Sequence, residues 1–314
     1  MATVTLGLAA GDRSRLGWRR ALMATLVVST MAVAFAALAW VLAADGLSAF
    51  DYAILACFVV TLPWNVIGFW NALIGLALLC FARDPLGTVV PQVRAYDPRA
   101  PIRGRTAIVM PIYNEDPERV FRHLDTTLRS LDATGDGDAF EVFVLSDTRV
   151  PAIALEEERR FAVWRSADPR PERLHYRRRV DNVGAKTGNL WDFIEAQGAG
   201  FDHMLVLDAD SLMSGAAITR LARMMDACPR LGILQALVVG LPSRSAFARI
   251  FQYGMRHGMR TYTMGSAWWQ GDCGPYWGHN AIVRLAAFKE HCRLPELPGE
   301  PPLGGHILSH DQVE

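Results

Sequence analysis

The strongest pattern along the chain is a pair of long uncharged runs near its start. No Asp, Glu, Lys or Arg occurs between residues 21 and 44, or between residues 52 and 82. A helix of about 20 apolar residues crosses the ~30 Å hydrocarbon core of a bilayer, and both runs exceed that length. Residues 21–82 are therefore predicted to form two transmembrane helices. A cleaved signal peptide is the alternative for the first run, but its apolar stretch would normally span only about 7–15 residues.

The charges that flank the runs predict their orientation. Four arginines precede the first run, Arg83 follows the second, and the short connection carries only Asp45 and Asp51. The positive-inside rule then places both ends of the pair in the cytoplasm. Residues 1–20 become a basic cytoplasmic tail, and the lipid bilayer is an expected partner. The second run also contains Pro63, Asn65 and Asn71, which a bilayer tolerates when neighbouring helices satisfy the polar groups.

Beyond a linker rich in Pro, Gly and Arg at residues 83–105, the pattern changes to alternating short apolar runs and helical periodicity. Helices are expected near residues 117–131, 152–165, 187–197 and 215–227. Buried strands are predicted at residues 106–111, 140–145, 174–178 and 203–207. This alternation is typical of an α/β fold with a mostly parallel sheet, in which ligands bind at the carboxyl ends of the strands. A further strand-like segment covers residues 276–283.

Composition argues against several classes of function. Hydrophobic residues make up 51% of the chain, and the excess lies in the two runs. The formal net charge is zero, so bulk electrostatics gives no reason to expect a nucleic-acid partner. The five cysteines include no CxxC pair, which argues against a zinc site and a disulfide framework.

Acidic residues follow two of the predicted strands. Asp147 comes after one strand, and Asp208 and Asp210 come after another. Residues two apart in an extended chain project to the same side, so Asp208 and Asp210 can face one ligand. Mg²⁺ or Mn²⁺ prefers such oxygen ligands, and Mg²⁺ is commonly held by one or two carboxylates together with substrate phosphates. A solvated turn is the alternative for this pair.

Three other segments carry candidate chemistry. Lys186, one of only two lysines, lies in a glycine-punctuated loop and offers a compact charge for phosphate, unless it is simply solvated. Residues 268–280 are dense in aromatics and glycine, which suits a sugar ring but also an aromatic cluster packed at the membrane or in the core. Ser309-His-Asp-Gln312 matches a capping box, so Asp311 is expected in the first turn of a helix.

Taken together, these segments resemble the processive family 2 glycosyltransferases, the class of cellulose, chitin and hyaluronan synthases. The residues in these motifs are most similar to those of a branch in Gram-negative bacteria that builds the β-1,2-linked backbone of osmoregulated periplasmic glucans from UDP-glucose. The resemblance covers roughly residues 20–314. The matching segments are Val109–Glu115, Val144–Asp147, Ala185–Asn189, Asp208–Asp210, Tyr276–Asn280 and His310–Asp311.

The resemblance implies a role for each motif. Asp147 is similar to the acid at the uracil–ribose end of the donor, and Lys186 to the lysine near the diphosphate. Asp208 and Asp210 resemble the nucleotide-binding and metal-binding aspartates, the metal being Mg²⁺ or Mn²⁺. Asp311 resembles the catalytic base. The segment similar to the acceptor-sugar site consists of Trp277, Gly278, His279 and Asn280.

The family further implies a GT-A, Rossmann-like domain over residues 106–314 and an inverting transfer of glucose from UDP-glucose to a growing glucan. The catalytic domain would face the cytoplasm at the bacterial inner membrane. The motif that closes over the diphosphate, and further membrane helices, are expected to follow Glu314, so the sequence is expected to be a fragment. A synthase of another β-linked polysaccharide, a lipid-linked sugar transferase and a non-catalytic sensor remain as alternatives.

Overall fold

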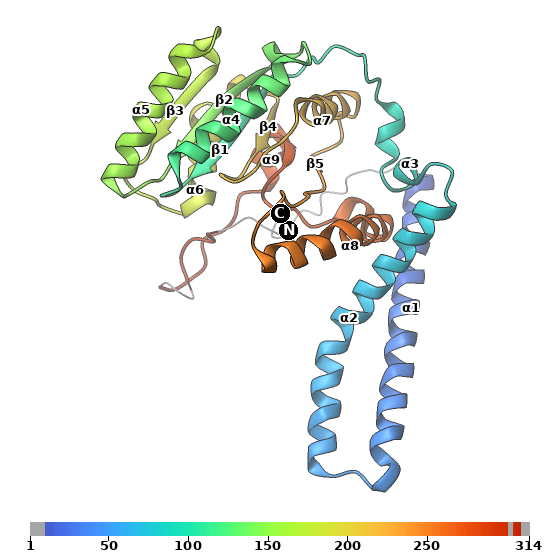
Figure 1. Cartoon of the computed structure of the whole chain (residues 1–314). Coiled ribbons are helices and arrows are strands. Elements are labelled where there is room, and N and C mark those ends of the chain that lie inside the picture. The colour runs from blue at the N-terminus through green and yellow to red at the C-terminus, as the bar shows by residue number, and fades with distance from the viewer. Residues whose placement is uncertain (1–9, 301–303, 309–314) are drawn as a thin grey trace. The chain divides into compact units, whose positions relative to one another are not determined.

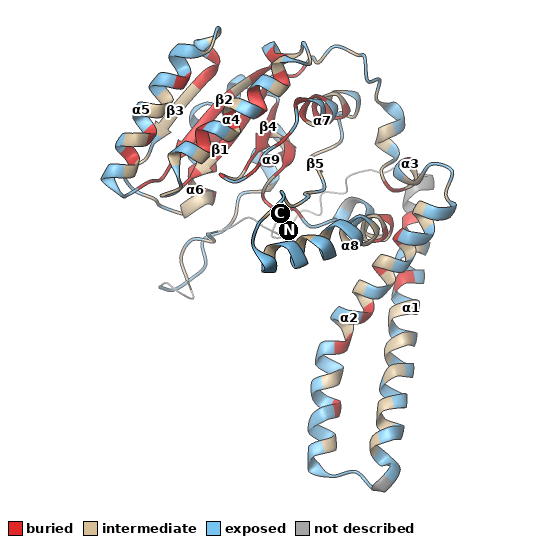
Figure 2. Cartoon of the chain, viewed as in Figure 1, coloured by how far each residue is buried: buried red, intermediate tan, exposed pale blue. Residues whose placement is uncertain are grey.

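The computed structural model describes residues 10–300 and 304–308, and it begins with a hairpin of two long helices. These are α1 (Ala10–Leu42) and α2 (Ala49–Phe81), and Ser48 starts α2 with a capping box to Asp51. Both contain a segment long and apolar enough to cross a membrane, and most side chains of these segments are exposed (Figure 2). The prediction of two long apolar helices is confirmed. Pro63 lies within α2 without ending it.

The rest of the chain is built around a six-stranded sheet with strand order β3-β2-β1-β4-β6-β5 (Figure 1). Strands β1, β2, β3 and β4 pair in parallel, whereas β6 runs antiparallel to both β4 and β5. The predicted α/β class with a mostly parallel sheet is therefore confirmed. The strands are β1 (Thr106–Ile112), β2 (Phe140–Ser146), β3 (Leu174–Arg178), β4 (His203–Val206), β5 (Ile233–Gln235) and β6 (Ala281–Arg284).

Helices cover both faces of the sheet, as the near-continuous apolar strands require. On one face, Ile108, Met110 and their neighbours pack against α4, α5 and α7. On the other, Ala107 and Val109 pack against α6 and α9. The covering helices are α4 (Pro117–Asp132), α5 (Pro151–Ala167), α6 (Ala185–Ala196), α7 (Gly215–Ala227) and α9 (Leu285–His291).

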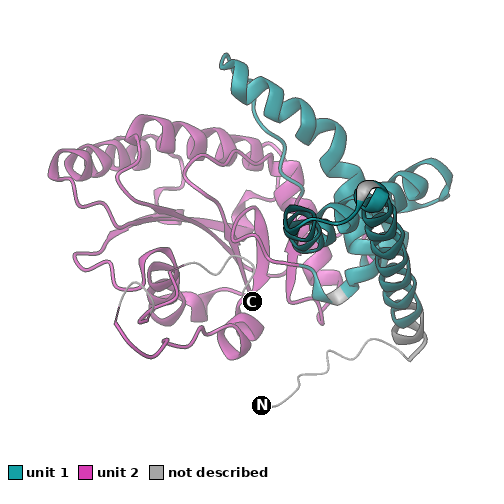
Figure 3. Ribbon diagram, turned by 90° about the horizontal axis from the view of Figure 1, so that it is seen from below, with its two compact units in different colours: residues 1–93, 237–274 teal, residues 94–236, 275–314 magenta. Residues whose placement is uncertain are grey.

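Contacts divide the chain into two compact units (Figure 3). One unit combines residues 1–93 with residues 237–274, and the other combines residues 94–236 with residues 275–314. The first unit contains α1, α2, α3 (Pro85–Val89) and a 25-residue helix, α8 (Ala246–Gln270), which returns to pack against α2. The second unit contains the sheet and its covering helices.

One expectation needs correction. The strand expected over residues 276–283 is limited to β6, because Gly278 and Asn280 have positive φ angles that interrupt an extended chain. The linker expected at residues 83–105 contains α3 and a short 3₁₀ helix, Pro91–Ala95. Helix α8 and strand β5 were not anticipated.

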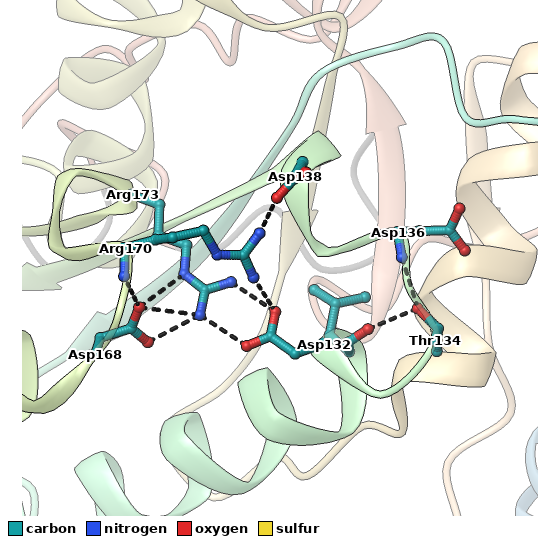
Figure 4. A network of polar contacts seen from close by, with 8 residues as sticks. Asp132, Thr134, Asp136, Asp138, Asp168, Arg170 and Arg173 are labelled. Carbon is teal, nitrogen blue, oxygen red and sulfur yellow. Dashed lines mark hydrogen bonds and ion pairs between the residues drawn. The ribbon is translucent and has the colours of Figure 1, made fainter.

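An arginine network stabilises the sheet unit next to the start of β3 (Figure 4). The Arg173 side chain is only 5% exposed and donates to both carboxylate oxygens of Asp132, at 2.7 and 2.8 Å, and to Asp168 at 2.8 Å. Arg170 also pairs with Asp132. Despite partial burial of its carboxyl, hydrogen bonds from Arg173 lower the pKa of Asp132. A buried guanidinium that lacked these carboxylates would be costly, so Asp132 and Asp168 compensate the burial of Arg173.

Candidate functional site

The candidate site lies where the parallel strands end. Residue Asp147 follows β2, Asp208 follows β4, and Asn114 lies in the turn after β1. The Asp147 N–H donates to the Ile112 carbonyl at 2.9 Å, and the Leu207 N–H donates to Val109 at 2.9 Å. These bonds join the ends of β2 and β4 to the end of the central strand β1. The sheet topology thus brings the loops to one edge.

Asp147 is held by an arginine that sequence reasoning did not single out. The Arg179 Nε and Nη2 atoms donate to the two Asp147 carboxylate oxygens, each at 2.7 Å, and Asp147 is 4% exposed. Arg179 also donates to Asp192 at 2.9 Å and to the Ala185 carbonyl at 3.0 Å. Burial opposes the charged form, but bonds to Asp147 and Asp192 raise the pKa of Arg179. The planar, bidentate pair fixes the direction of the Asp147 carboxylate.

A fully buried carboxylate anchors the loop that carries Asp147. Glu157 of α5 accepts from Thr148 Oγ1 at 2.6 Å, from Ser146 Oγ at 2.7 Å and from the Tyr176 hydroxyl at 3.0 Å. Burial raises the pKa of Tyr176 above its ordinary range, so its hydroxyl remains protonated and donates. Thr148 in turn accepts from the Asn114 N–H at 3.0 Å. The network therefore ties the loops after β1 and β2 to one buried group.

A second cluster forms around Asp208. Lys186, in the first turn of α6, donates to Asp208 Oδ1 at 2.6 Å and to the Gly278 carbonyl at 3.2 Å. His279 Nε2 lies 3.8 Å from Asp208 Oδ2. The structure therefore brings together Lys186, Asp208 and the Gly278–His279 loop, which the sequence separates by about ninety residues. A helix amino terminus and a lysine both favour a bound anion such as phosphate.

Asp210 is exposed, two residues after Asp208. His123 of α4 lies within its electrostatic reach: burial, Arg122 and Arg119 lower the pKa of His123, while the Asp210 charge opposes that shift. No group of three or more His, Cys, Asp or Glu side chains is arranged to hold a metal within the described ranges 10–300 and 304–308. Two carboxylates alone fit Mg²⁺ or Mn²⁺ that is shared with substrate phosphates, because such ions often take most of their ligands from phosphate and water.

The segment expected to bind an acceptor lies beside this cluster. The Trp277 side chain is partly exposed, and the backbone N–H of Trp277 donates to Gln235 Oε1 at 2.8 Å. Asn280 is almost buried: its N–H donates to the Val206 carbonyl at 2.7 Å, and its carbonyl accepts from the Ala236 N–H at 3.0 Å. The backbone of Asn280, directly before β6, therefore connects the end of β4 with the residue after β5.

Positive φ angles at non-glycine residues, and some of the buried polar atoms without a hydrogen-bond partner, occur around the site. Within the described part of the chain, the non-glycine residues with positive φ are Asn114 and Asn280, in loops of the site, and Ala185, the first residue of α6. The buried side-chain atoms without a protein hydrogen bond include Thr187 Oγ1, His279 Nδ1 and Asn280 Oδ1. Such features concentrate at binding sites, where a ligand or water supplies the missing partner. Asp311 and His310 lie outside the described residues.

Comparison with known proteins agrees with this geometry. The model of glycosyl transferase family 2 matches residues 107–292, more than half of the chain. The chain belongs to glycosyltransferase family 2.

Relatives within this family share a name. The chain is 42% identical over 299 residues to the glucans biosynthesis glucosyltransferase H of Rhodopseudomonas palustris, covering 95% of this chain and 41% of that protein. It is 38% identical over 297 residues to the protein of the same name from Vibrio cholerae, covering 95% and 40%. The chain thus spans about two fifths of the length of these relatives. Among solved structures, a mannosyltransferase from Pyrobaculum calidifontis in complex with GDP-Man and Mn²⁺ is 16% identical, with a TM-score of 0.44 and coverage of 72% of this chain and 59% of that one.

Sequence reasoning missed three residues that organise this family 2 site: Arg179, Glu157 and Asn114. Arg179 ends a run of three arginines, and nothing in the run distinguishes the one that meets Asp147. Glu157 stands among three consecutive glutamates of α5, where helical periodicity was the available signal. Asn114 lies in the matching segment Val109–Glu115. That it connects two loops in a strained conformation follows only from its φ of 53° and its contacts.

Proposed function

We propose that the protein transfers glucose from UDP-glucose to a growing β-glucan at the cytoplasmic face of the bacterial inner membrane. The observation that carries the proposal is the cluster of Lys186, Asp208 and the Gly278–His279 loop at the carboxyl end of a parallel sheet. The glucosyltransferase H relatives, which match almost the whole chain, support glucose as the sugar and a glucan as the product.

Each part of the site receives a role in donor binding. Asp147, fixed by Arg179, accepts hydrogen bonds from the uracil–ribose end of UDP-glucose. Lys186 exchanges its contact with Asp208 for the donor diphosphate, helped by the amino terminus of α6. Asp208 and Asp210 would hold Mg²⁺ or Mn²⁺ against the diphosphate, and the ion would act as a Lewis acid that offsets charge on the departing UDP.

Acceptor binding is assigned to the loop at the same edge of the sheet, and proton transfer to Asp311. The indole of Trp277 gives a sugar ring an apolar face, while His279 and Asn280 offer polar atoms that lack protein partners. Asp311 acts as the general base: it takes the proton of the acceptor hydroxyl as that oxygen attacks the anomeric carbon. The bond to UDP breaks on the opposite side of that carbon, so the configuration inverts.

Helices α1 and α2 would anchor the site at the membrane. Their arginine-rich flanks favour a cytoplasmic location for both ends, which gives the site access to cytosolic UDP-glucose. This arrangement suits a synthase whose product is a polymer assembled next to the bilayer.

The decisive experiment is sugar transfer by the full-length protein that carries this sequence, reconstituted in proteoliposomes. We expect radiolabel to enter polymer from UDP-glucose but not from UDP-galactose or UDP-N-acetylglucosamine, and we expect EDTA to stop transfer and Mg²⁺ or Mn²⁺ to restore it. Polymer made from another UDP-sugar would contradict the donor assignment. Transfer that persists in EDTA would contradict the metal assignment.

A further inference from the structure

Helix α5 carries a buried carboxylate that the proposed chemistry does not use. The side chain of Glu157 is 0% exposed, whereas its neighbours Glu156 and Glu158 are 34% and 51% exposed. Glutamate is almost never fully buried unless partners satisfy its charge. The partners that the described chain supplies are three hydroxyl groups, those of Ser146, Thr148 and Tyr176.

Other hydrogen bonds fix the direction in which these hydroxyls point. Thr148 Oγ1 accepts the Asn114 N–H at 3.0 Å, and Ser146 Oγ accepts the Thr148 N–H at 3.1 Å. Each hydroxyl has one hydrogen, which then remains for the Glu157 oxygens at 2.6 and 2.7 Å. The Tyr176 hydroxyl supplies a third hydrogen at 3.0 Å.

The charged form of Glu157 is the one that this arrangement fits. An ionised carboxylate only accepts, so it can take all three hydrogens on its two oxygens. A protonated acid or an amide would place a hydrogen of its own against a hydroxyl hydrogen. At least one buried hydroxyl would then lack an acceptor, which is costly.

Two of the three hydroxyls flank Asp147 directly in the sequence. Ser146 and Thr148 contact Glu157 of α5, whereas the Asp147 carboxylate contacts Arg179, which also pairs with Asp192 of α6. Successive side chains of an extended segment alternate in direction, so holding both neighbours towards α5 turns Asp147 towards α6. Glu157 therefore fixes the backbone on both sides of Asp147.

The same carboxylate connects the ends of neighbouring strands. Ser146 ends β2, Tyr176 lies in β3, and Thr148 accepts from Asn114 in the turn after β1. The Asp147 N–H also donates to the Ile112 carbonyl at the end of β1. Loss of the charge at residue 157 would thus release the segment that carries Asp147 from its supports, while Arg179 would still hold the carboxylate itself.

We propose that Glu157 is a positioning residue for nucleotide binding: its charged carboxylate directs the hydroxyls of Ser146 and Thr148 and so turns Asp147 towards the nucleoside end of the donor. This inference rests on the proposed role of Asp147 in binding UDP-glucose. The nucleoside end is the part of the donor affected, because Lys186 and the Asp208 cluster belong to other loops.

The test compares matched variants of the full-length protein that carries this sequence. Glu157→Gln removes the charge, and Glu158→Gln makes the same change at the exposed neighbouring residue. Thr148→Val deletes the hydroxyl but keeps the shape of the side chain, whereas Thr148→Ser keeps the hydroxyl. Isothermal titration calorimetry then gives the Kd for UDP and for inorganic pyrophosphate, both with Mg²⁺.

The expected effect is selective. A loop that holds its binding conformation about one tenth of the time binds about tenfold more weakly, so we expect that rise in the UDP Kd for Glu157→Gln and Thr148→Val. Glu158→Gln and Thr148→Ser should bind UDP as wild type does, and pyrophosphate should bind all five proteins equally. In an Asp147→Asn background, Glu157→Gln should weaken UDP binding no further, because it acts through Asp147.

Other results overturn the inference in recognisable ways. Equal losses of UDP and pyrophosphate binding would show general damage, and wild-type UDP binding by Glu157→Gln would show that the charge is not needed. If Glu157→Gln does not fold, Thr148→Val decides, since wild-type UDP binding by that variant contradicts the proposal. A full additional loss in the Asp147→Asn background would show that Glu157 acts on another group. Normal UDP binding by Asp147→Asn alone would instead refute the proposed donor role of Asp147, and the inference with it.

Discussion

The sharpest test of the proposed donor site is removal of its lysine. Lys186→Met keeps the length of the side chain but deletes the charge that contacts Asp208 and the Gly278 carbonyl. The chain offers a matched control, because its only other lysine, Lys289, is exposed in the last turn of α9. The two variants change the same charge in the same sheet unit, at the site and away from it.

The structure sets the expected magnitudes. The Lys186 and Asp208 side chains are 27% and 33% exposed, so their ion pair is worth at most about 1 kcal/mol and its loss should leave the protein folded. A charge-assisted hydrogen bond to a diphosphate is worth about 1.5–3 kcal/mol. We therefore expect the Kd for UDP to rise about 10- to 150-fold in Lys186→Met and to stay unchanged in Lys289→Met.

Isothermal titration calorimetry with UDP and with uridine separates the possible causes. Uridine lacks the phosphates, so its Kd should be the same for wild type and Lys186→Met. A parallel loss of uridine and UDP binding would show that the substitution damages the pocket as a whole. Unchanged UDP binding would refute the assignment of Lys186 to the diphosphate and leave it as a partner of Asp208 only.

Four other predictions follow from the site and the fold. In the full-length protein, Asp210→Asn should abolish sugar transfer with no loss of thermal stability, and near-normal turnover with Mg²⁺ would make this residue a simple turn residue. Asp311→Asn should leave the UDP-glucose Kd within a few-fold of wild type and lower transfer about 10²- to 10⁴-fold, measured by radiolabel incorporation; lost UDP binding with normal turnover would contradict its role as base. Arg173→Met should lower the free energy of unfolding by about 3 kcal/mol, since it leaves the nearly buried Asp168 carboxylate without its guanidinium partner and Asp132 with Arg170 alone. The pKa of Asp132 is lowered in the folded protein, chiefly by hydrogen bonds from Arg173, so its contribution to stability is present above the unfolded pKa and is lost as pH falls through the folded value. Urea denaturation should therefore show a smaller acid-dependent loss in Arg173→Met, where only Arg170 still pairs with Asp132, than in wild type. A cysteine at Gly46 should react only with periplasmic reagents, and cytoplasmic labelling would refute the topology.

Local signals in the sequence predicted most of the sheet unit. Strand β3 and helix α7 begin and end where expected, and the strands predicted as β1, β2 and β4 differ from the structure by one residue at their carboxyl ends. These elements are short buried runs with nearby caps: Ser214, for example, accepts from the Ala217 N–H to start α7. Because burial on both faces makes a parallel strand continuously apolar, the run itself marks the strand.

Features that depend on distant partners could not be predicted in this way. Helix α8 contains Gly254, Gly258 and Gly265, which lower helix propensity by about 1 kcal/mol each, so its sequence does not favour a helix by itself. Packing against α2 offsets this cost, because the missing side chain of Gly265 lets the Asn71 backbone come into contact with α8. Similarly, the partner of Asp147 is Arg179, which lies beyond the end of β3, where strand periodicity no longer indicates a direction.

The strained residues of the site show how its loops are held before any ligand binds. Asn114, with φ of 53°, accepts from the Arg149 and Val150 N–H groups at 3.1 Å, so its left-handed conformation is fixed by the neighbouring loop. Asn280, with φ of 49°, is fixed on both sides by β4 and by Ala236. Left-handed asparagine is tolerated more readily than most residues, and these bonds offset the remaining cost. Because neighbouring loops rather than substrate hold these conformations, a donor that binds here meets a preformed edge and loses little free energy to ordering the protein.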